Sequence, residues 1–290
     1  MCKTRRTILQ KRIQHQRRLL FRLVRKVKKQ RDKKSIHQLR VCLKSWQAFY
    51  DFCSYAHPSS KNSIQFPKNW KKLFRQLGKL REIQVTTSII QHLKIKKEEK
   101  FILKRFFVLR KKKWKKRILL KLNRLKSESK KHLLAAALFL IRKKTKKLIE
   151  LATQEFFQKH LLNPFHSGLR RNRYNNLHAK RTHLRKFIQL TSFFGLTKKS
   201  KQKIPLFEKI NHVATKLGKW HDAQIVEKQI RKFFRETSND IGSANKIKII
   251  KITHQKERLL YWESQHLLRD FVYLHVKKSP LKFKNYLPLH

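Results

Sequence analysis

Residues that interrupt helices are scarce along this chain. It has 5 glycines and 6 prolines in 290 residues, where average usage would give about 20 and about 15. Apolar residues recur instead at intervals of three and four, as at Ile36, Leu39, Leu43, Trp46 and Tyr50. This spacing is typical of the buried face of a helix. We find no sustained apolar–polar alternation and no Asn-Gly or Asp-Gly hairpin turn, which are the signals of β-strands. The sequence therefore predicts an all-α fold of long helices.

Four breaks divide the chain, at residues 57–67, 163–168, 195–205 and 238–242, where Pro, Gly, Ser and Asn gather. Together with the apolar periodicity, they predict eight helices, at residues 7–29, 34–56, 67–94, 97–126, 129–162, 171–195, 203–236 and 246–275. Residues 279–290 contain two prolines and no periodicity, so we expect an irregular tail. The longest apolar run, residues 133–141, is shorter than the roughly 20 residues that cross a bilayer. We therefore expect no transmembrane segment.

Two motifs occur twice in the same order. The first, apolar-His-x-x-Arg-x-x-x-basic, begins at Ile36 and again at Leu177; the second, Leu-Gly-x-x-basic-acidic, begins at Leu77 and again at Leu217. The His-to-Gly separation is 41 residues in the first copy and 40 in the second. This duplication predicts two similar halves of about four helices, each with its own bundle-like core. We divide a single domain, residues 1–290, into halves at 1–128 and 129–278.

The charge of the chain points to a polyanionic partner. Its 76 Lys and Arg residues against 16 Asp and Glu give a net charge of +60, while an apolar content of 40% supplies a core and excludes a disordered basic tail. Such a charge opposes compaction unless counterions or a polyanion neutralise it. We therefore expect a folded protein that works with a polyanion.

The three cysteines indicate a reducing compartment. Cys42 and Cys53 would lie roughly 16 Å apart along one helix, which is too far for a disulfide. We expect both to be buried apolar residues. The N-terminal residues are charged almost at once and show no apolar signal-peptide segment. These features predict a soluble, cytoplasmic protein.

The first motif places a basic stripe on each of two helices. His37, Arg40 and Lys44 are spaced i, i+3, i+7, as are His178, Arg181 and Arg185. In the first copy the stripe lies about 100° around the helix from the apolar stripe, so it flanks the core and suits the wall of a groove. Arg and Lys there would bind phosphate oxygens. The alternative is a solvated face. The two histidines either orient an arginine or contact phosphate directly.

The second motif adds further cations and two acids. Lys79 continues a stripe begun at Lys72 and Arg75, and Lys219 partly repeats it in the second half. Gly78 and Gly218 lack a Cβ atom, which allows close packing or a local break. Glu82 and Asp222 occupy equivalent positions. Because acids are so few, we expect them to orient basic side chains by ion pairing and not to act in catalysis.

The duplicated motifs, in this order and at this spacing, resemble the CHAD domain, the conserved histidine α-helical domain, across essentially the whole chain. The resemblance implies two pseudo-symmetric four-helix bundles around a basic cleft that binds inorganic polyphosphate, often at polyphosphate granules. It carries over to the motif positions His37, Arg40, Lys44, His178, Arg181, Arg185 and Lys186. The second motif and the N-terminal helix add Lys79, Arg81, Lys219, Arg18 and Arg22.

The chain departs from the family pattern at several positions. Ser45 and Gln47 stand where further basic residues usually follow the first motif, and Ile188 does so in the second half. Gln84 and Gln224 replace the second acid after Leu-Gly. These changes weaken the first groove wall, and the basic N-terminal helix, with Arg18 and Arg22, would compensate.

We expect no enzymatic activity, no cofactor and no metal site. The chain has no Walker A loop, Gly-x-Ser-x-Gly elbow, His-Glu-x-x-His motif or Cys-x-x-Cys pair. Its 16 acids are too few to suggest a cluster that holds divalent ions for phosphoryl transfer. The rival hypothesis is nonspecific nucleic-acid or general polyanion binding. Its best candidate surface is the run Lys111–Arg117 around Trp114, which also suits an anionic membrane.

Overall fold

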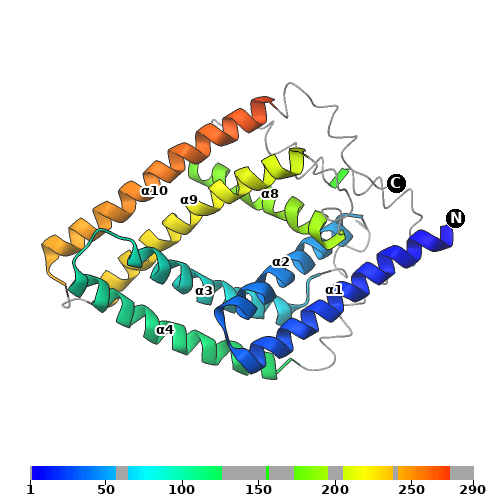
Figure 1. Ribbon diagram of the computed structural model, residues 1–290, viewed down its shortest axis with the longest axis horizontal. Coiled ribbons are helices and arrows are strands. Elements are labelled where there is room, and N and C mark those ends of the chain that lie inside the picture. The colour runs from blue at the N-terminus through cyan, green and yellow to red at the C-terminus, as the bar shows by residue number, and fades with distance from the viewer. Residues whose placement is uncertain are drawn as a thin grey trace.

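The structure, a computed structural model, describes residues 2–56, 65–125, 155–156, 173–194, 205–237 and 241–274. These ranges contain helices and no strands (Figure 1), which confirms the all-α prediction. The helices are α1 (Cys2–Gln30), α2 (Lys33–Ala56), α3 (Lys68–Gln91), α4 (Lys97–Asn123), α8 (Arg173–Phe194), α9 (Pro205–Glu236) and α10 (Ser243–Val272).

The observed helix ends agree with the predicted ranges to within five residues for all of these helices. Local signals account for this agreement. Arg31 takes a positive φ of 53° between α1 and α2, and Asp32 Oδ1 accepts a hydrogen bond of 2.8 Å from the backbone of Ser35, which caps α2. The expected helix at 129–162, apart from residues 155–156, and the expected tail at 279–290 lie outside the described residues, as does the proposed division after residue 128.

Two pairs of long helices, one from the first part of the chain and one from the last, are joined by cross-contacts (Figure 1). Helix α3 runs beside α4, and α9 runs beside α10. Helix α2 packs against α8, and α3 packs against α9, so each contact joins the first part of the chain to the last. This arrangement brings the helices that carry the repeated motifs together.

The buried core does not divide into one core per half. Among the described residues, one buried apolar cluster extends from Ile13 to Phe271 and includes Trp46, Trp70 and Trp220. A second cluster combines the ends of α3 and α4 with those of α9 and α10. The expectation of a separate core in each half is therefore wrong for this part of the chain. The reason is that α2 and α3 bury apolar faces against α8 and α9.

The two central cysteines match their prediction. Cys42 and Cys53 are buried and unbridged. Burial raises the pKa of the Cys42 thiol to about 12, so it behaves as a small apolar residue. Within the described ranges, no helix has the length and apolar character needed to cross a membrane.

Candidate anion-binding site

Helices α2 and α8 hold the two His-x-x-Arg motifs against each other. Ser45 of α2 donates a hydrogen bond of 2.6 Å to Gln189 Oε1 of α8. One turn further along each helix, the ring of Phe49 stacks on the ring of Phe193, with 4.4 Å between centroids. These contacts lie directly beyond the basic residues of each motif, so they set how the two basic stripes face each other.

Basic side chains of both motifs gather between these helices. The charge of Lys44 on α2 interacts with Arg40 of its own helix and with Arg181 and Arg185 of α8. Arg81 of α3 joins them because its charge acts on Arg40. We call these five residues the basic cluster. Arg40 and Arg181, which are equivalent in the two motifs, also interact. The duplicated motifs therefore contribute to one site.

Burial and mutual repulsion both act on the basic cluster. Burial, with added repulsion from Arg40, Arg181 and Arg185, lowers the pKa of Lys44 to about 7. Burial and the charge of Arg185 lower the pKa of Arg181 to about 10. Both causes disfavour the charged forms. An anion placed among these groups would remove the repulsion, so the cluster is suited to binding negative charge.

One carboxylate lies among the cations. Asp222 of α9 interacts with Arg81, Arg181, Arg185 and Arg40, whose charges lower its pKa, but burial has the larger effect and raises the pKa overall. Its equivalent, Glu82, forms an ion pair of 3.2 Å with Lys79, and its charge also acts on Arg40. These two negative charges cannot balance the five basic side chains.

The arginines have donor atoms that the described protein groups leave unused. The Nε atoms of Arg40, Arg181 and Arg185 are buried and have no hydrogen-bond partner among the described residues, and neither does Nδ1 of His221. Each of these four residues as a whole is only partly buried, so part of each side chain remains accessible. Buried donors without acceptors cost about 1–3 kcal/mol each. Oxygen atoms of a bound anion are the acceptors that such a group lacks.

Packing holds two of the guanidinium groups in place. The Arg40 guanidinium lies over the ring of Phe74, with Cζ 5.1 Å from the centroid. Nη2 of Arg185 donates a hydrogen bond of 3.1 Å to the backbone oxygen of Ala214. Within the described ranges, neither guanidinium group has a carboxylate in contact. The side chains are thus positioned before any ligand arrives.

The histidines border the basic cluster in a neutral form. Burial, followed by the charge of Arg81, lowers the pKa of His37, and burial lowers the pKa of His178. The ring of His178 lies 5.0 Å from the ring of His221, whose pKa is lowered by burial to about 3. Sequence reasoning missed His221 as a site residue. Its position in the second motif, equivalent to Arg81, was the signal that could have identified it.

The other predicted site residues lie elsewhere. Lys186 of α8 forms an ion pair of 2.7 Å with Asp51 of α2, so it joins helices. Lys79 is 56% exposed and pairs with Glu82. The remaining three are exposed: Lys219, Arg18 and Arg22. Of the twelve predicted positions, the structure brings Arg40, Lys44, Arg81, Arg181 and Arg185 into the cluster, with His37 and His178 beside it.

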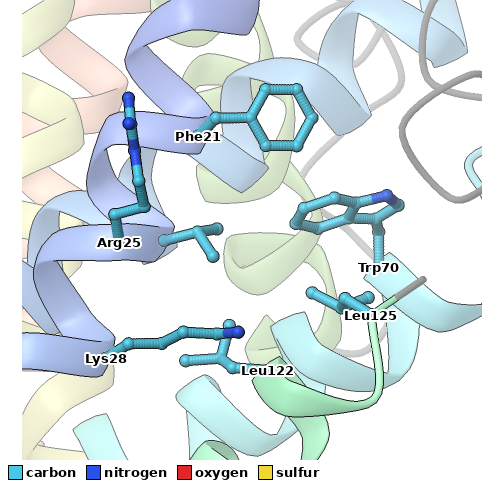
Figure 2. A pocket seen from close by; sticks show the side chains of 7 residues that line it. Phe21, Arg25, Lys28, Trp70, Leu122 and Leu125 are labelled. Atoms are coloured by element: carbon cyan, nitrogen blue, oxygen red, sulfur yellow. The ribbon is translucent and has the colours of Figure 1, made fainter. Parts of the chain in front are cut away.

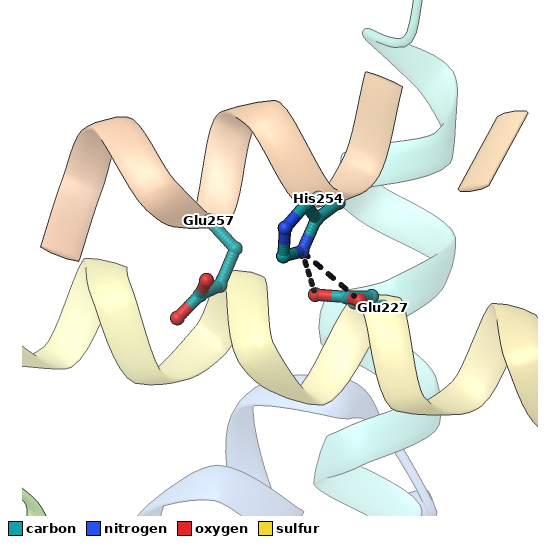
Figure 3. A group of neighbouring side chains, drawn as sticks. All are labelled: Glu227, His254 and Glu257. Carbon is teal, nitrogen blue, oxygen red and sulfur yellow. Dashed lines mark hydrogen bonds and ion pairs between the residues drawn. The ribbon is translucent and has the colours of Figure 1, made fainter. Parts of the chain in front are cut away.

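A second group of side chains has metal-ligand chemistry (Figure 3). Ligand atoms of Glu227 on α9 and of His254 and Glu257 on α10 lie within 4.8 Å of one another. These groups also have protein partners: Arg231 Nη2 lies 2.7 Å from Glu227 Oε1, and Trp220 donates a hydrogen bond of 2.7 Å to Glu257 Oε1. The group therefore serves to join α9 to α10. The sequence offered only the His-x-x-Glu spacing on α10 as a signal.

A cavity of about 260 Å³ lies between α1, α3 and α4 (Figure 2). Phe21, Trp70 and Leu122 form apolar parts of its wall, while Arg25 and Lys28 of α1 contribute positive charge. Trp70 is only 1% exposed, so the cavity offers little aromatic surface for stacking. It is separate from the basic cluster, to which it contributes no residue.

Comparisons with known proteins agree with this architecture. The family model described as CHAD domain matches residues 11–231, which is more than half of the chain. The matched range includes both copies of both repeated motifs. A solved structure, the crystal structure of the CHAD domain from the plant Ricinus communis, superposes with a TM-score of 0.70 at 11% sequence identity. The match covers 93% of this chain and 92% of that one. No curated protein matches the sequence.

Proposed function

The chain belongs to the CHAD domain family, and from this premise we propose that it binds inorganic polyphosphate, without catalysis, through the basic cluster. The observation that carries the proposal is the meeting of Arg40 and Lys44 with Arg181 and Arg185 around one carboxylate. These residues come from two motifs far apart in the sequence. We infer that they line the basic cleft expected from the family resemblance.

The chemistry of the cluster suits phosphate oxygens. Guanidinium groups present planar pairs of donors that match phosphate, and Lys44 adds a compact charge. Buried Nε atoms on Arg40, Arg181 and Arg185 lack acceptors among the described residues. A phosphate chain carries repeated negative charge, so one ligand can satisfy cations contributed by α2, α3 and α8 together.

Polyphosphate fits this cluster better than a nucleic acid does. Single-stranded nucleic acids bind where bases can stack on aromatic side chains. Beside the cluster, the ring of Phe74 is covered by Arg40, and Trp46 and Trp220 are fully buried. None of these three rings therefore offers a stacking surface beside the cluster.

The charges at the site support the proposed noncatalytic role. Metal-assisted phosphoryl transfer requires carboxylates that attract divalent cations. Asp222 interacts with four arginines, and burial raises its pKa. This position therefore disfavours binding of a divalent cation beside the arginines. We propose that the protein holds polyphosphate in the cytoplasm, at polyphosphate granules.

The second candidate function is nonspecific nucleic-acid or general polyanion binding through α4. Lys112, Lys113 and Lys116 are exposed there. However, Trp114 packs against the apolar core, and Arg117 lies over its ring at 5.0 Å. This packing limits stacking of Trp114 on a base, so the run Lys111–Arg117 supports charge-driven binding only.

A competition experiment separates the two functions. Long-chain polyphosphate competes with duplex and single-stranded nucleic acid at physiological salt and equal phosphate concentration. The double variant Arg40→Ala/Arg181→Ala is compared with Lys112→Ala/Lys113→Ala, which removes the same charge from an exposed surface. We expect a preference for polyphosphate that persists as salt rises, and a much larger loss in the first variant. Equal losses in both variants, or affinity that collapses with salt for every ligand, would refute a specific site.

A further inference from the structure

The outer face of α4 combines exposed apolar side chains with cations. Phe101 is 65% exposed, Leu109 60%, Leu120 49% and Val108 42%. Exposed apolar residues that occur singly are ordinary on protein surfaces. Here four large ones occur on one helix. This concentration requires a specific explanation.

These residues share one face of the helix. At 100° per residue, positions 101, 105, 108, 109, 112, 116 and 120 fall within a sector of about 120°. Arg105, Lys112 and Lys116 of this set are exposed cations. The buried residues Leu103, Phe107, Ile118 and Leu122 lie on the opposite side. The outer face is therefore a mixed apolar and basic strip about 28 Å long, at 1.5 Å per residue.

Charge along this helix has a single sign after the first turn, which holds Glu98 and Glu99. Between Lys100 and Asn123 the chain has eleven Lys and Arg residues and no Asp or Glu. Helix α4 lies at the margin of the molecule, with α3 beside it (Figure 1). Its outer face is thus open to a large, flat and negatively charged partner.

We propose that the outer face of α4 binds the surface of an anionic lipid bilayer. The helix would lie parallel to the membrane, with Phe101 and Leu109 at the boundary between headgroups and acyl chains and the cations directed to lipid phosphates. Lys side chains reach past apolar neighbours to place their charge among headgroups. This function is distinct from polyphosphate binding because no residue of the basic cluster takes part.

The observations favour lipid over other anionic partners. A nucleic acid would use the cations and can stack one base on Phe101, but it gains nothing from the exposed Leu109, Leu120 and Val108 on the same face, since only aromatic rings stack on bases. A lipid bilayer uses both kinds of side chain at once. The positive charge of the strip and its exposed apolar side chains therefore both favour an anionic lipid bilayer as the partner.

The chain supplies a matched control on another helix. Leu259 of α10 is 61% exposed, compared with 60% for Leu109. Its neighbour one turn later is Glu263, so a membrane surface of negative charge is less favourable there. Substitution of either leucine removes the same apolar group from a similarly exposed position.

Vesicle sedimentation tests the proposal with the full chain. The vesicles contain phosphatidylcholine alone or phosphatidylcholine mixed with phosphatidylserine. We expect binding to the mixed vesicles, reduced about tenfold by Leu109→Ser and further by Phe101→Ser, because each loses apolar area from the interface. Leu259→Ser should bind like the unchanged protein. Lys112→Ser/Lys116→Ser should reduce binding about fivefold for each charge.

Several outcomes would overturn the proposal. One is absence of binding to the mixed vesicles. Another is equal binding by the unchanged protein and the Leu109→Ser and Phe101→Ser variants, which would show that only diffuse charge acts. Equal weakening by Leu109→Ser and Leu259→Ser would also contradict a specific face. The leucine and phenylalanine variants should keep their polyphosphate affinity, so failure here is distinguishable from failure of the polyphosphate proposal.

Discussion

A Cβ atom at Gly218 would lie 3.0 Å from Nη2 of Arg185, so the glycine of the second Leu-Gly motif makes room for an arginine of the basic cluster. The corresponding distance from Gly78 to Nη2 of Arg40 is 4.0 Å, an ordinary contact. The two repeated glycines therefore differ in what they do. Only at the second glycine would a Cβ atom lie so close that the tip of Arg185 must shift.

Gly218→Ala should separate binding from stability. Alanine in place of a helical glycine favours folding by roughly 0.5–1 kcal/mol, and the flexible tip of Arg185 can move aside. We expect unchanged or higher stability in chemical denaturation, but several-fold weaker polyphosphate binding, because Arg185 is displaced from Ala214. Gly78→Ala is the matched control and should retain its affinity. Equal affinities of the two variants would contradict this role of Gly218.

Polyphosphate affinity should fall as the pH rises through about 7. The pKa of Lys44 is lowered to about 7 by burial and neighbouring cations, and a bound anion would raise it again. Binding above pH 7 therefore requires uptake of a proton, which weakens it. Titration calorimetry in buffers of different ionisation enthalpy measures this uptake between pH 7 and 9.

Lys44→Arg provides the control for this pH dependence. Arginine keeps its charge throughout the range, so the proton uptake and the slope should both disappear. His37 and His178 do not account for the slope, because their pKa values are lowered from 6.5 and both are neutral above pH 7. A slope that persists in Lys44→Arg would assign the titration to another group.

Asp222→Asn should strengthen anion binding. The substitution removes the carboxylate that interacts with Arg40, Arg81, Arg181 and Arg185, so a ligand has one more positive charge to neutralise. Because burial raises the pKa of Asp222 overall, the charged carboxylate does not stabilise the fold at neutral pH, and we expect no decrease in the free energy of unfolding. Asp270→Asn, at an exposed position on α10, should leave the polyphosphate affinity unchanged. An unchanged affinity for Asp222→Asn would remove Asp222 from the site.

Lys186→Ala should affect the protein mainly through stability. The ion pair of Lys186 with Asp51 joins α2 to α8, and both side chains are about one third exposed. Such pairs contribute about 0–1 kcal/mol. We expect a small decrease in the denaturation midpoint and a polyphosphate affinity close to that of a Lys219→Ala variant. A loss of affinity as large as that of Arg181→Ala would return Lys186 to the binding site.

Local sequence predicted the described helices to within five residues at each end, and the repeat selected basic residues that the fold brings together. The scarcity of Gly and Pro and the three-to-four residue spacing located the described helices, and the repeat identified Arg40, Lys44, Arg181 and Arg185. The repeat did not lead us to His221, although this residue stands at the position of the second motif that is equivalent to Arg81. It also placed Lys186 in the site, although this side chain turns to Asp51.

The sequence by itself determined which residues form helices and which face of each helix is apolar or basic, because both properties depend on neighbours within a few turns. Only the tertiary structure decided that α2 meets α8 and that α3 meets α9, which mixes the two halves in the core. Arg40 and Arg181 are 141 positions apart in the sequence. Their meeting depends on how apolar faces such as those of Phe49 and Phe193 fit together, and periodicity along one helix carries no information about its partner.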